Sequence, residues 1–193
     1  MTRIIAGRFG GRSLAVPPRG TRPTSDRVRE AIFSRLAHYG VLEDARVLDL
    51  FAGSGALGLE AASRGASSVT LVDSARVAAD VVRRNVDALD LPGVRVVQRP
   101  AQTYVDSLAG VPEGSGLHLV LVDPPYDLGR EPLDELLAGL AVPGVLDPAA
   151  VVVVERSRRS PEPSWPDGWE VLARTDYGDT AVWFAGPQPD EDD

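Results

Sequence analysis

The stretch that most constrains the fold runs from Leu48 to Ala66, "LDLFAGSGALGLEAASRGA". Inside it, Gly53, Gly55 and Gly58 spell G-x-G-x-x-G, which is typical of a nucleotide-type cofactor bound at a strand-to-helix turn. The apolar segment "ARVLDLF" before the glycines predicts a buried strand, and the segment after them predicts a helix. The chain is therefore expected to bind a cofactor where a strand of an α/β sheet ends.

Strands and helices alternate along most of the remaining sequence. We expect strands at residues 45–51, 67–73, 94–98, 117–123 and 149–155, and helices at 75–89, 101–108 and 132–140. Residues 169–186 predict two further strands joined by a turn at Tyr177–Thr180. This alternation predicts an α/β protein with a seven-stranded, mostly parallel sheet covered by helices on both faces.

The first forty residues predict a different arrangement. Residues 4–6 and 13–16 are expected to form a β-hairpin, followed by the non-helical linker "PPRGTRPTSD". A helix is expected from about Asp26 to Tyr39, capped by Thr24 or Ser25 and ended by Gly40. We therefore divide the chain into an N-terminal extension (1–40), a cofactor-binding domain (41–186) and an acidic, disordered tail (187–193).

The charge is distributed unevenly. Residues 1–40 contain eight arginines against Asp26 and Glu30, whereas the whole chain has a net charge of −8. A basic segment on an acidic body favours an anionic partner such as RNA over a merely solvated helix face. The arginines expected to contact RNA are Arg3, Arg8, Arg12, Arg19 and Arg22.

Several classes of site are excluded or disfavoured. The chain has no cysteine, which rules out disulfides, cysteine-bound zinc, iron–sulfur clusters and a thiolate nucleophile. His38 and His118 are isolated from each other, so no metal site is expected. The sequence shows neither a signal peptide nor an apolar run long enough to span a bilayer, and we expect a monomeric, cytoplasmic protein.

Asp49 and Asp73 narrow the choice of cofactor. A P-loop needs a lysine after its glycines and the chain has none, which leaves a dinucleotide or S-adenosylmethionine. A carboxylate at Asp49, four residues before Gly53, would repel a pyrophosphate and attract an ammonium group. Asp49 could instead bond only to loop amides. Asp73, twenty residues after Gly53, is placed to bind ribose hydroxyls in either cofactor.

The fourth expected strand ends in Asp123-Pro124-Pro125-Tyr126. Asp123 and the carbonyl of Pro124 can accept hydrogen bonds from an exocyclic amine, and Tyr126 offers a ring on which a flipped base can stack. The two prolines stiffen the turn. The alternative is that this tetrapeptide only ends a strand. Because ligands bind at the carboxyl ends of the strands, the turn is expected to share a crevice with the glycine loop.

Taken together, "DLFAGSG", "VTLVD" and "DPPY" resemble the class I S-adenosylmethionine-dependent amino-methyltransferases. "RIIAGRFGGRSL" and "RPTSDRVREAIFSRL" narrow the resemblance to the bacterial family that methylates the N2 amine of guanine 966 in 16S ribosomal RNA. The resemblance spans residues 3 to about 155. It implies a Rossmann-like fold, S-adenosylmethionine as cofactor and 16S rRNA in a partly assembled small ribosomal subunit as substrate.

The resemblance also implies roles for individual residues. It assigns the methionine end of the cofactor to Asp49, Phe51, Gly53, Ser54, Gly55 and Gly58. Asp73 would hold the ribose and Ser74 the adenine edge, while Thr24 would close over the cofactor. Asp123, Pro124, Pro125 and Tyr126 would hold the target guanine as the catalytic residues. The chain departs from the pattern at Pro100, which leaves only backbone near Ala101 to contact the adenine amine.

Two other functions stay open at the level of sequence. One is a DNA adenine or cytosine amino-methyltransferase, although such enzymes often carry a target-recognition insertion for which this chain has no room. The other is a non-catalytic, RNA-binding factor of ribosome assembly that retains the fold. The presence of Asp49, Asp73 and the Asp123–Tyr126 turn favours an enzyme.

Overall fold

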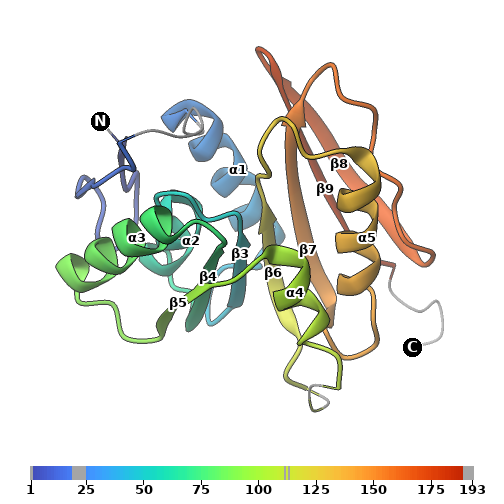
Figure 1. The fold of residues 1–193 in the computed structure, drawn as a ribbon, viewed down its shortest axis with the longest axis horizontal. Helices are drawn as coiled ribbons and strands as arrows, with labels where there is room; N and C mark the ends of the chain where they lie inside the picture. Colours follow the sequence, from blue (N-terminus) through green and yellow to red (C-terminus); the bar gives the residue numbers. More distant parts are fainter. Residues whose placement is uncertain (1, 19–24, 111, 113, 189–193) are drawn as a thin grey trace.

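The computed structural model describes residues 2–18, 25–110, 112 and 114–188. Its main sheet has seven strands in the order β5-β4-β3-β6-β7-β9-β8 (Figure 1). Neighbouring strands among the first five pair in parallel, and β9 pairs antiparallel with both β7 and β8. These strands are β3 (Arg46–Leu50), β4 (Ser68–Asp73), β5 (Val94–Gln98), β6 (Leu117–Val122), β7 (Leu146–Ser157), β8 (Trp169–Tyr177) and β9 (Thr180–Pro187). The predicted fold class is confirmed.

In the described part of the chain, five helices cover the two faces of this sheet. They are α1 (Asp26–Tyr39), α2 (Ala56–Ser63), α3 (Arg76–Leu89), α4 (Ala101–Asp106) and α5 (Arg130–Leu140). On one face, Phe33 of α1, Leu59 of α2 and Val82 of α3 belong to one buried cluster. On the other face, Val105 of α4 and Leu137 of α5 belong to a second. The apolar surface that these clusters remove from water is the main source of the fold's stability.

The order of the strands determines where a ligand can bind. The chain runs from β3 outward to β4 and β5, and then returns to place β6 on the other side of β3. Such a reversal leaves a crevice at the carboxyl ends of the two central strands. The loops that follow β3 and β6 therefore form the candidate site, and these loops contain the glycines and the Asp123–Tyr126 turn.

The N-terminal hairpin is smaller than expected. Its strands are β1 (Thr2–Arg3) and β2 (Ser13–Leu14), so the prediction of a first strand at residues 4–6 is wrong. The reason is that the backbone N–H groups of Ile5 and Ala6 donate to the Glu60 carboxylate, at 2.7 and 3.0 Å, and not to a partner strand. Glu60 lies on α2 and is fully buried.

The helix α1 matches its predicted bounds. The Ser25 side chain caps its first turn by accepting a hydrogen bond from the Val28 N–H at 3.3 Å. Gly40 ends it with a φ of 72°, in the left-handed region that glycine adopts without strain. Thr24, the other predicted cap, lies outside the described residues.

Both ends of the described chain are joined to the body. Ile4 and Leu14 are buried in the same cluster as α1, α2 and α3. At the other end, β9 includes Pro187, and the Gln188 N–H donates to the Gly168 carbonyl at 2.7 Å. Ordered structure thus extends two residues into the segment expected to be a disordered tail. No helix in the described ranges is long and apolar enough to cross a membrane.

Candidate active site

The glycine loop adopts an unusual backbone conformation. Phe51, Gly53 and Gly55 have φ angles of 64°, 58° and 80°, all in the left-handed region. Glycine takes this conformation freely, but for Phe51 it costs about 1–3 kcal/mol. Gly55 then becomes the N-cap of α2. Strain of this kind persists only where neighbouring groups hold it, and here side chains from β4 and α3 do so.

Asp73 and Asn85 hold the loop. The Gly53 N–H donates to Asp73 Oδ2 at 2.8 Å, and the Ala75 N–H donates to Asp73 Oδ1 at 2.8 Å. Asp73 thus ties the loop both to the end of β4 and to the start of α3. Each carboxylate oxygen keeps a further lone pair, so the predicted ribose contact stays a prediction compatible with this geometry. On the other side of the loop, Asn85 Nδ2 donates to the Ser54 carbonyl at 2.9 Å.

Asn85 also binds the N-terminal extension, a role that the sequence analysis missed. Its Oδ1 accepts from the Ala15 N–H at 2.8 Å, and its Nδ2 donates to the Ala15 carbonyl at 3.0 Å. One buried amide thereby joins Ala15 to Ser54. The only hint in the sequence is an asparagine on the apolar face of α3, level with Val81 and Val82. Its partners could not be predicted because they are distant in sequence.

Asp49 is the most unusual ionisable group of the site. Its side chain is buried, Oδ2 accepts from the Gly58 N–H at 2.8 Å, and Oδ1 is buried with no hydrogen-bond partner. Burial raises the pKa of Asp49 to about 8, and the carboxylates of Asp123 and Asp73 also raise it, against the hydrogen bond from Gly58. The loop amide therefore accounts for only one of the two oxygens.

The residues around Asp49 fit S-adenosylmethionine better than a dinucleotide. The unpartnered Oδ1 is a buried acceptor that lacks a donor, which an ammonium group would supply. A pyrophosphate would instead face the carboxylates of Asp49, Asp73 and Asp123. This fit supports the predicted cofactor and the predicted role of Asp49.

Gly58 contributes through packing as well as through its N–H. A Cβ added at this position would lie 2.2 Å from Leu71 Cδ2, far inside any real contact. The absence of a side chain therefore lets α2 pack closely on β4 and keeps the Gly58 N–H within reach of Asp49. Gly58 is predicted to contact the cofactor. In this structure its N–H binds the Asp49 side chain.

The four residues of the turn after β6, Asp123 to Tyr126, differ in their exposure to solvent. Pro124 is buried, Asp123 and Pro125 are half-buried, and Tyr126 is 64% exposed. Asp49 on β3 pairs with Leu121 on β6. Asp123 therefore lies two residues beyond this pair, directly after the end of β6. At this position the Asp123 carboxylate raises the pKa of Asp49.

Arg156 supports this turn from β7 and was also missed by the sequence analysis. Its Nη2 donates to the Leu128 carbonyl at 2.7 Å, while its Nη1 is buried with no hydrogen-bond partner. The Leu128 N–H in turn donates to the Pro125 carbonyl at 3.0 Å. Burial lowers the pKa of Arg156. The available signal in the sequence was an arginine close after the apolar run of residues 149–154.

The other predicted site residues lie at the same edge of the sheet. Ser74 is exposed directly after β4, and Ala101 is the buried first residue of α4, after β5. Pro100 is the N-cap of α4 and has no N–H to donate, as expected from its type. The structure therefore adds no adenine contact at this position. No group of three potential metal ligands occurs in the part of the chain that the structure describes.

The predicted RNA-binding arginines that the structure describes are all exposed. Arg3 forms an ion pair with Asp26 at 3.4 Å, Arg8 lies over the Phe9 ring at 5.2 Å, and Arg12 lies in the same short segment. Arg19, Arg22 and the predicted cofactor residue Thr24 fall outside the described residues. The exposed arginines thus lie on the extension that Asn85 and Glu60 attach to α3 and α2.

Comparisons with known proteins agree with this architecture. The chain is 39% identical over 170 residues to ribosomal RNA small subunit methyltransferase D of Escherichia coli, covering 88% of this chain and 81% of that protein. It is 32% identical over 177 residues to the protein of the same name from Haemophilus influenzae, covering 91% and 89% of the two chains. The solved structure of yhhF from Escherichia coli superposes with a TM-score of 0.83, at 37% identity over 96% of this chain and 97% of that chain. The family model described as "Conserved hypothetical protein 95" matches residues 2–186, and the chain belongs to that family.

Proposed function

We propose that this protein transfers a methyl group from S-adenosylmethionine to the N2 amine of a guanine in 16S ribosomal RNA. The proposed target is guanine 966 in a partly assembled small ribosomal subunit. The relatives named ribosomal RNA small subunit methyltransferase D support the class of substrate. Their names do not specify the target atom, which we infer from the resemblance of the sequence and from the chemistry of the site.

One observation carries the proposal. A buried carboxylate with an unpartnered oxygen, Asp49, lies on the strand next to the Asp123–Tyr126 turn. The first group suits the ammonium of the cofactor, and the second suits an exocyclic amine. Their placement on neighbouring parallel strands brings cofactor and target base to one crevice, where proximity and orientation supply much of the rate enhancement.

The residues of the turn are suited to a weakly nucleophilic amine. S-adenosylmethionine, held by Asp49 and Asp73, would supply an electrophilic methyl group to the amine. The amine would give up one proton, to Asp123 or to water. Asp123 and the Pro124 carbonyl accept hydrogen bonds from the amine and orient its lone pair. Tyr126, whose ring is largely exposed, stacks on the base once it leaves the RNA helix. The rigid diproline keeps these groups in place.

The exposed arginines of the extension provide the electrostatic part of RNA binding. Arg3, Arg8 and Arg12 are exposed, whereas the chain as a whole is acidic with a net charge of −8. Phosphates are therefore attracted to this segment and repelled by much of the remaining surface. Few such contacts give modest affinity for free RNA, which favours a substrate whose shape the enzyme also recognises.

The test is methyl transfer to defined substrates. Purified protein is incubated with tritiated S-adenosylmethionine and naked 16S rRNA, isolated small subunits or duplex DNA, and the products are digested to nucleosides. We expect N2-methylguanosine from the ribosomal substrates. Methylated adenine or cytosine in DNA would overturn the proposal, as would no transfer to any substrate by protein that binds the cofactor.

A further inference from the structure

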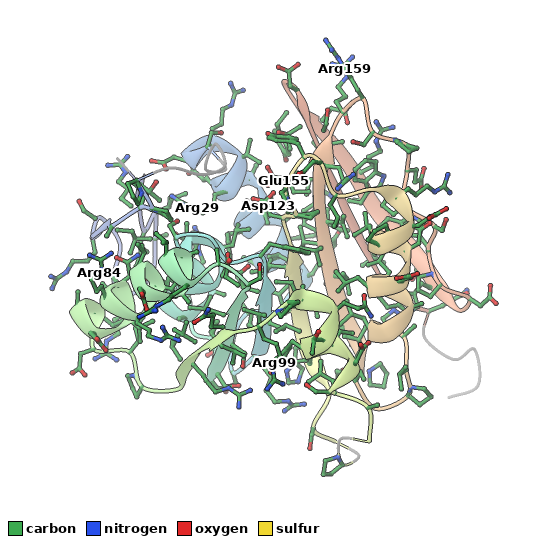
Figure 2. All side chains as sticks on the ribbon, in the orientation of Figure 1. Arg29, Arg84, Arg99, Asp123, Glu155 and Arg159 are labelled. Carbon is green, nitrogen blue, oxygen red and sulfur yellow. The ribbon has the colours of Figure 1, made fainter. Side chains whose placement is uncertain are left out.

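Glu155 is a nearly buried carboxylate beside the proposed target site. It lies on β7 and is 8% exposed. The parallel register pairs Val122 of β6 with Val154 of β7, so Asp123 and Glu155 each lie one residue beyond the same pair. Figure 2 shows both labelled side chains at the same end of the sheet. The two carboxylates are therefore neighbours across two adjacent strands, whose backbones are about 4.8 Å apart.

Both carboxylates continue the same face of the sheet. Side chains alternate along a strand, and Leu121 and Val153 pack in the cluster that contains α1, α2 and α3. Val122 and Val154 pack in the opposite cluster. By this alternation, Asp123 and Glu155 lie on the same face of the sheet as Leu121 and Val153.

Asp49 lies on that same face, because Val47 also packs in the first cluster. Across β3, β6 and β7 the carboxylates therefore follow one another in the order Asp49, Asp123, Glu155. Asp49 is held by Gly58 next to the glycine loop, whereas Glu155 lies on the far side of Asp123 from that loop. This position puts Glu155 closer to the proposed place of the base than to that of the cofactor.

The chemistry of this pair distinguishes among the bases. An ionised carboxylate only accepts hydrogen bonds. Guanine presents two adjacent donors on its Watson–Crick edge, the N2 amine and N1–H. Adenine and cytosine place an acceptor nitrogen next to their exocyclic amine, which would face a carboxylate without a proton between them. Asp123 alone accepts from any exocyclic amine, so it cannot make this distinction.

We propose that Glu155 accepts a hydrogen bond from N1–H of the target base and thereby selects guanine over adenine and cytosine. This inference rests on the proposed function, because it names a specificity-determining residue for that reaction. A site that is built to bond a polar group discriminates strongly against an analogue that lacks it. Loss of one hydrogen bond to a charged acceptor corresponds to about a 10- to 100-fold loss of kcat/KM.

The experiment uses two RNAs that differ only in the target base. One carries guanine at the target position, and the other carries 2-aminopurine, which keeps the 2-amino group but lacks both the N1 proton and O6. For the wild-type protein we expect kcat/KM on the 2-aminopurine RNA to be at least about tenfold lower. Equal rates on the two RNAs would overturn the proposal without any variant being needed.

The variant Glu155→Gln then tests the residue itself. A carboxamide can donate as well as accept, so we expect kcat/KM to fall on the guanine RNA and the difference between the two RNAs to narrow to a few-fold. The affinity for S-adenosylhomocysteine should stay within about threefold of wild type, because Glu155 is assigned to the base. A purely structural role would lower both rates equally, and that result would refute the assignment. Glu170→Gln, at an exposed position of β8, is the matched control.

Failure of this inference can be distinguished from failure of the proposed function. If the wild-type protein makes N2-methylguanosine but does not discriminate between the two RNAs, only the role of Glu155 is wrong. If the wild-type protein makes no N2-methylguanosine in any ribosomal substrate, the proposed function is wrong, and the role of Glu155 with it.

Discussion

Binding of the cofactor to this protein should release a proton, because Asp49 must lose one to hold an ammonium group. In the free protein, burial raises the pKa of Asp49 to about 8. An ammonium group beside the unpartnered Oδ1 would stabilise the ionised carboxylate and lower that pKa again. The perturbation is therefore a change of pH between 6 and 8. The expected response is a tighter complex at the higher pH.

The magnitude follows from the pKa. With a pKa of about 8, about 0.9 of the Asp49 carboxyls are protonated at pH 7, so binding should release about 0.9 proton. The dissociation constant should then fall about ninefold from pH 6 to 7 and about fivefold from pH 7 to 8. Above pH 8 the gain levels off, because more than half of the Asp49 carboxyls are already ionised and the α-amino group of the ligand loses its own charge in this range.

Isothermal titration calorimetry measures both quantities. S-adenosylhomocysteine is the suitable ligand, because it carries the same amino group without the reactive methyl group. Titrations at pH 7 in phosphate and in Tris give the number of protons released from the dependence on buffer ionisation enthalpy. Asp49→Asn should bind more weakly and release no proton, whereas the exposed control Asp87→Asn should behave as wild type. A dissociation constant that is constant from pH 6 to 8, with no buffer dependence, would refute the reasoning.

Three further results are expected. Asp123→Ala should abolish methyl transfer yet bind S-adenosylhomocysteine to within about tenfold of wild type, which calorimetry and tritium transfer together would check. Asn85→Ala removes three hydrogen bonds to backbone and should lower the free energy of unfolding by about 2–4 kcal/mol, measured by urea denaturation; an unchanged midpoint would contradict the proposed link. Replacing Arg8 and Arg12 by glutamine should reduce the slope of log affinity against log salt by about 0.7–0.9 for each lost phosphate contact, whereas Arg84→Gln on α3 should leave the slope unchanged.

The local parts of the fold could be predicted because their signals are local. The bounds of α1 match because Ser25 caps it and Gly40 ends it, and both residues act on their immediate neighbours. The ends of elements were less accurate. The strand expected at residues 149–155 is the longer β7, Leu146–Ser157, since pairing with β6 and β9 extends it at both ends.

The tertiary part of the site could not be predicted from the sequence. The spacing of Gly53 and Asp73 predicted that both lie at the cofactor site, because a turn, a helix and a strand of known geometry separate them. The direct hydrogen bond between them was not predicted. No such geometry relates Asn85 to Ala15, seventy residues away. The Glu60 carboxylate likewise replaced a strand partner for Ile5, and only the folded chain shows why the first strand is shifted.

The attachment of the extension has a consequence for how members of this family can exchange parts. Because Glu60 accepts the N–H groups of Ile5 and Ala6, and Asn85 clasps Ala15, the N-terminal segment is not a separable module. A chimaera that grafts the first eighteen residues of a relative onto this chain inherits mismatched partners on α2 and α3. A graft of the extension therefore has to continue through α3, so that it carries the arginines, the glycine loop and their shared anchors together.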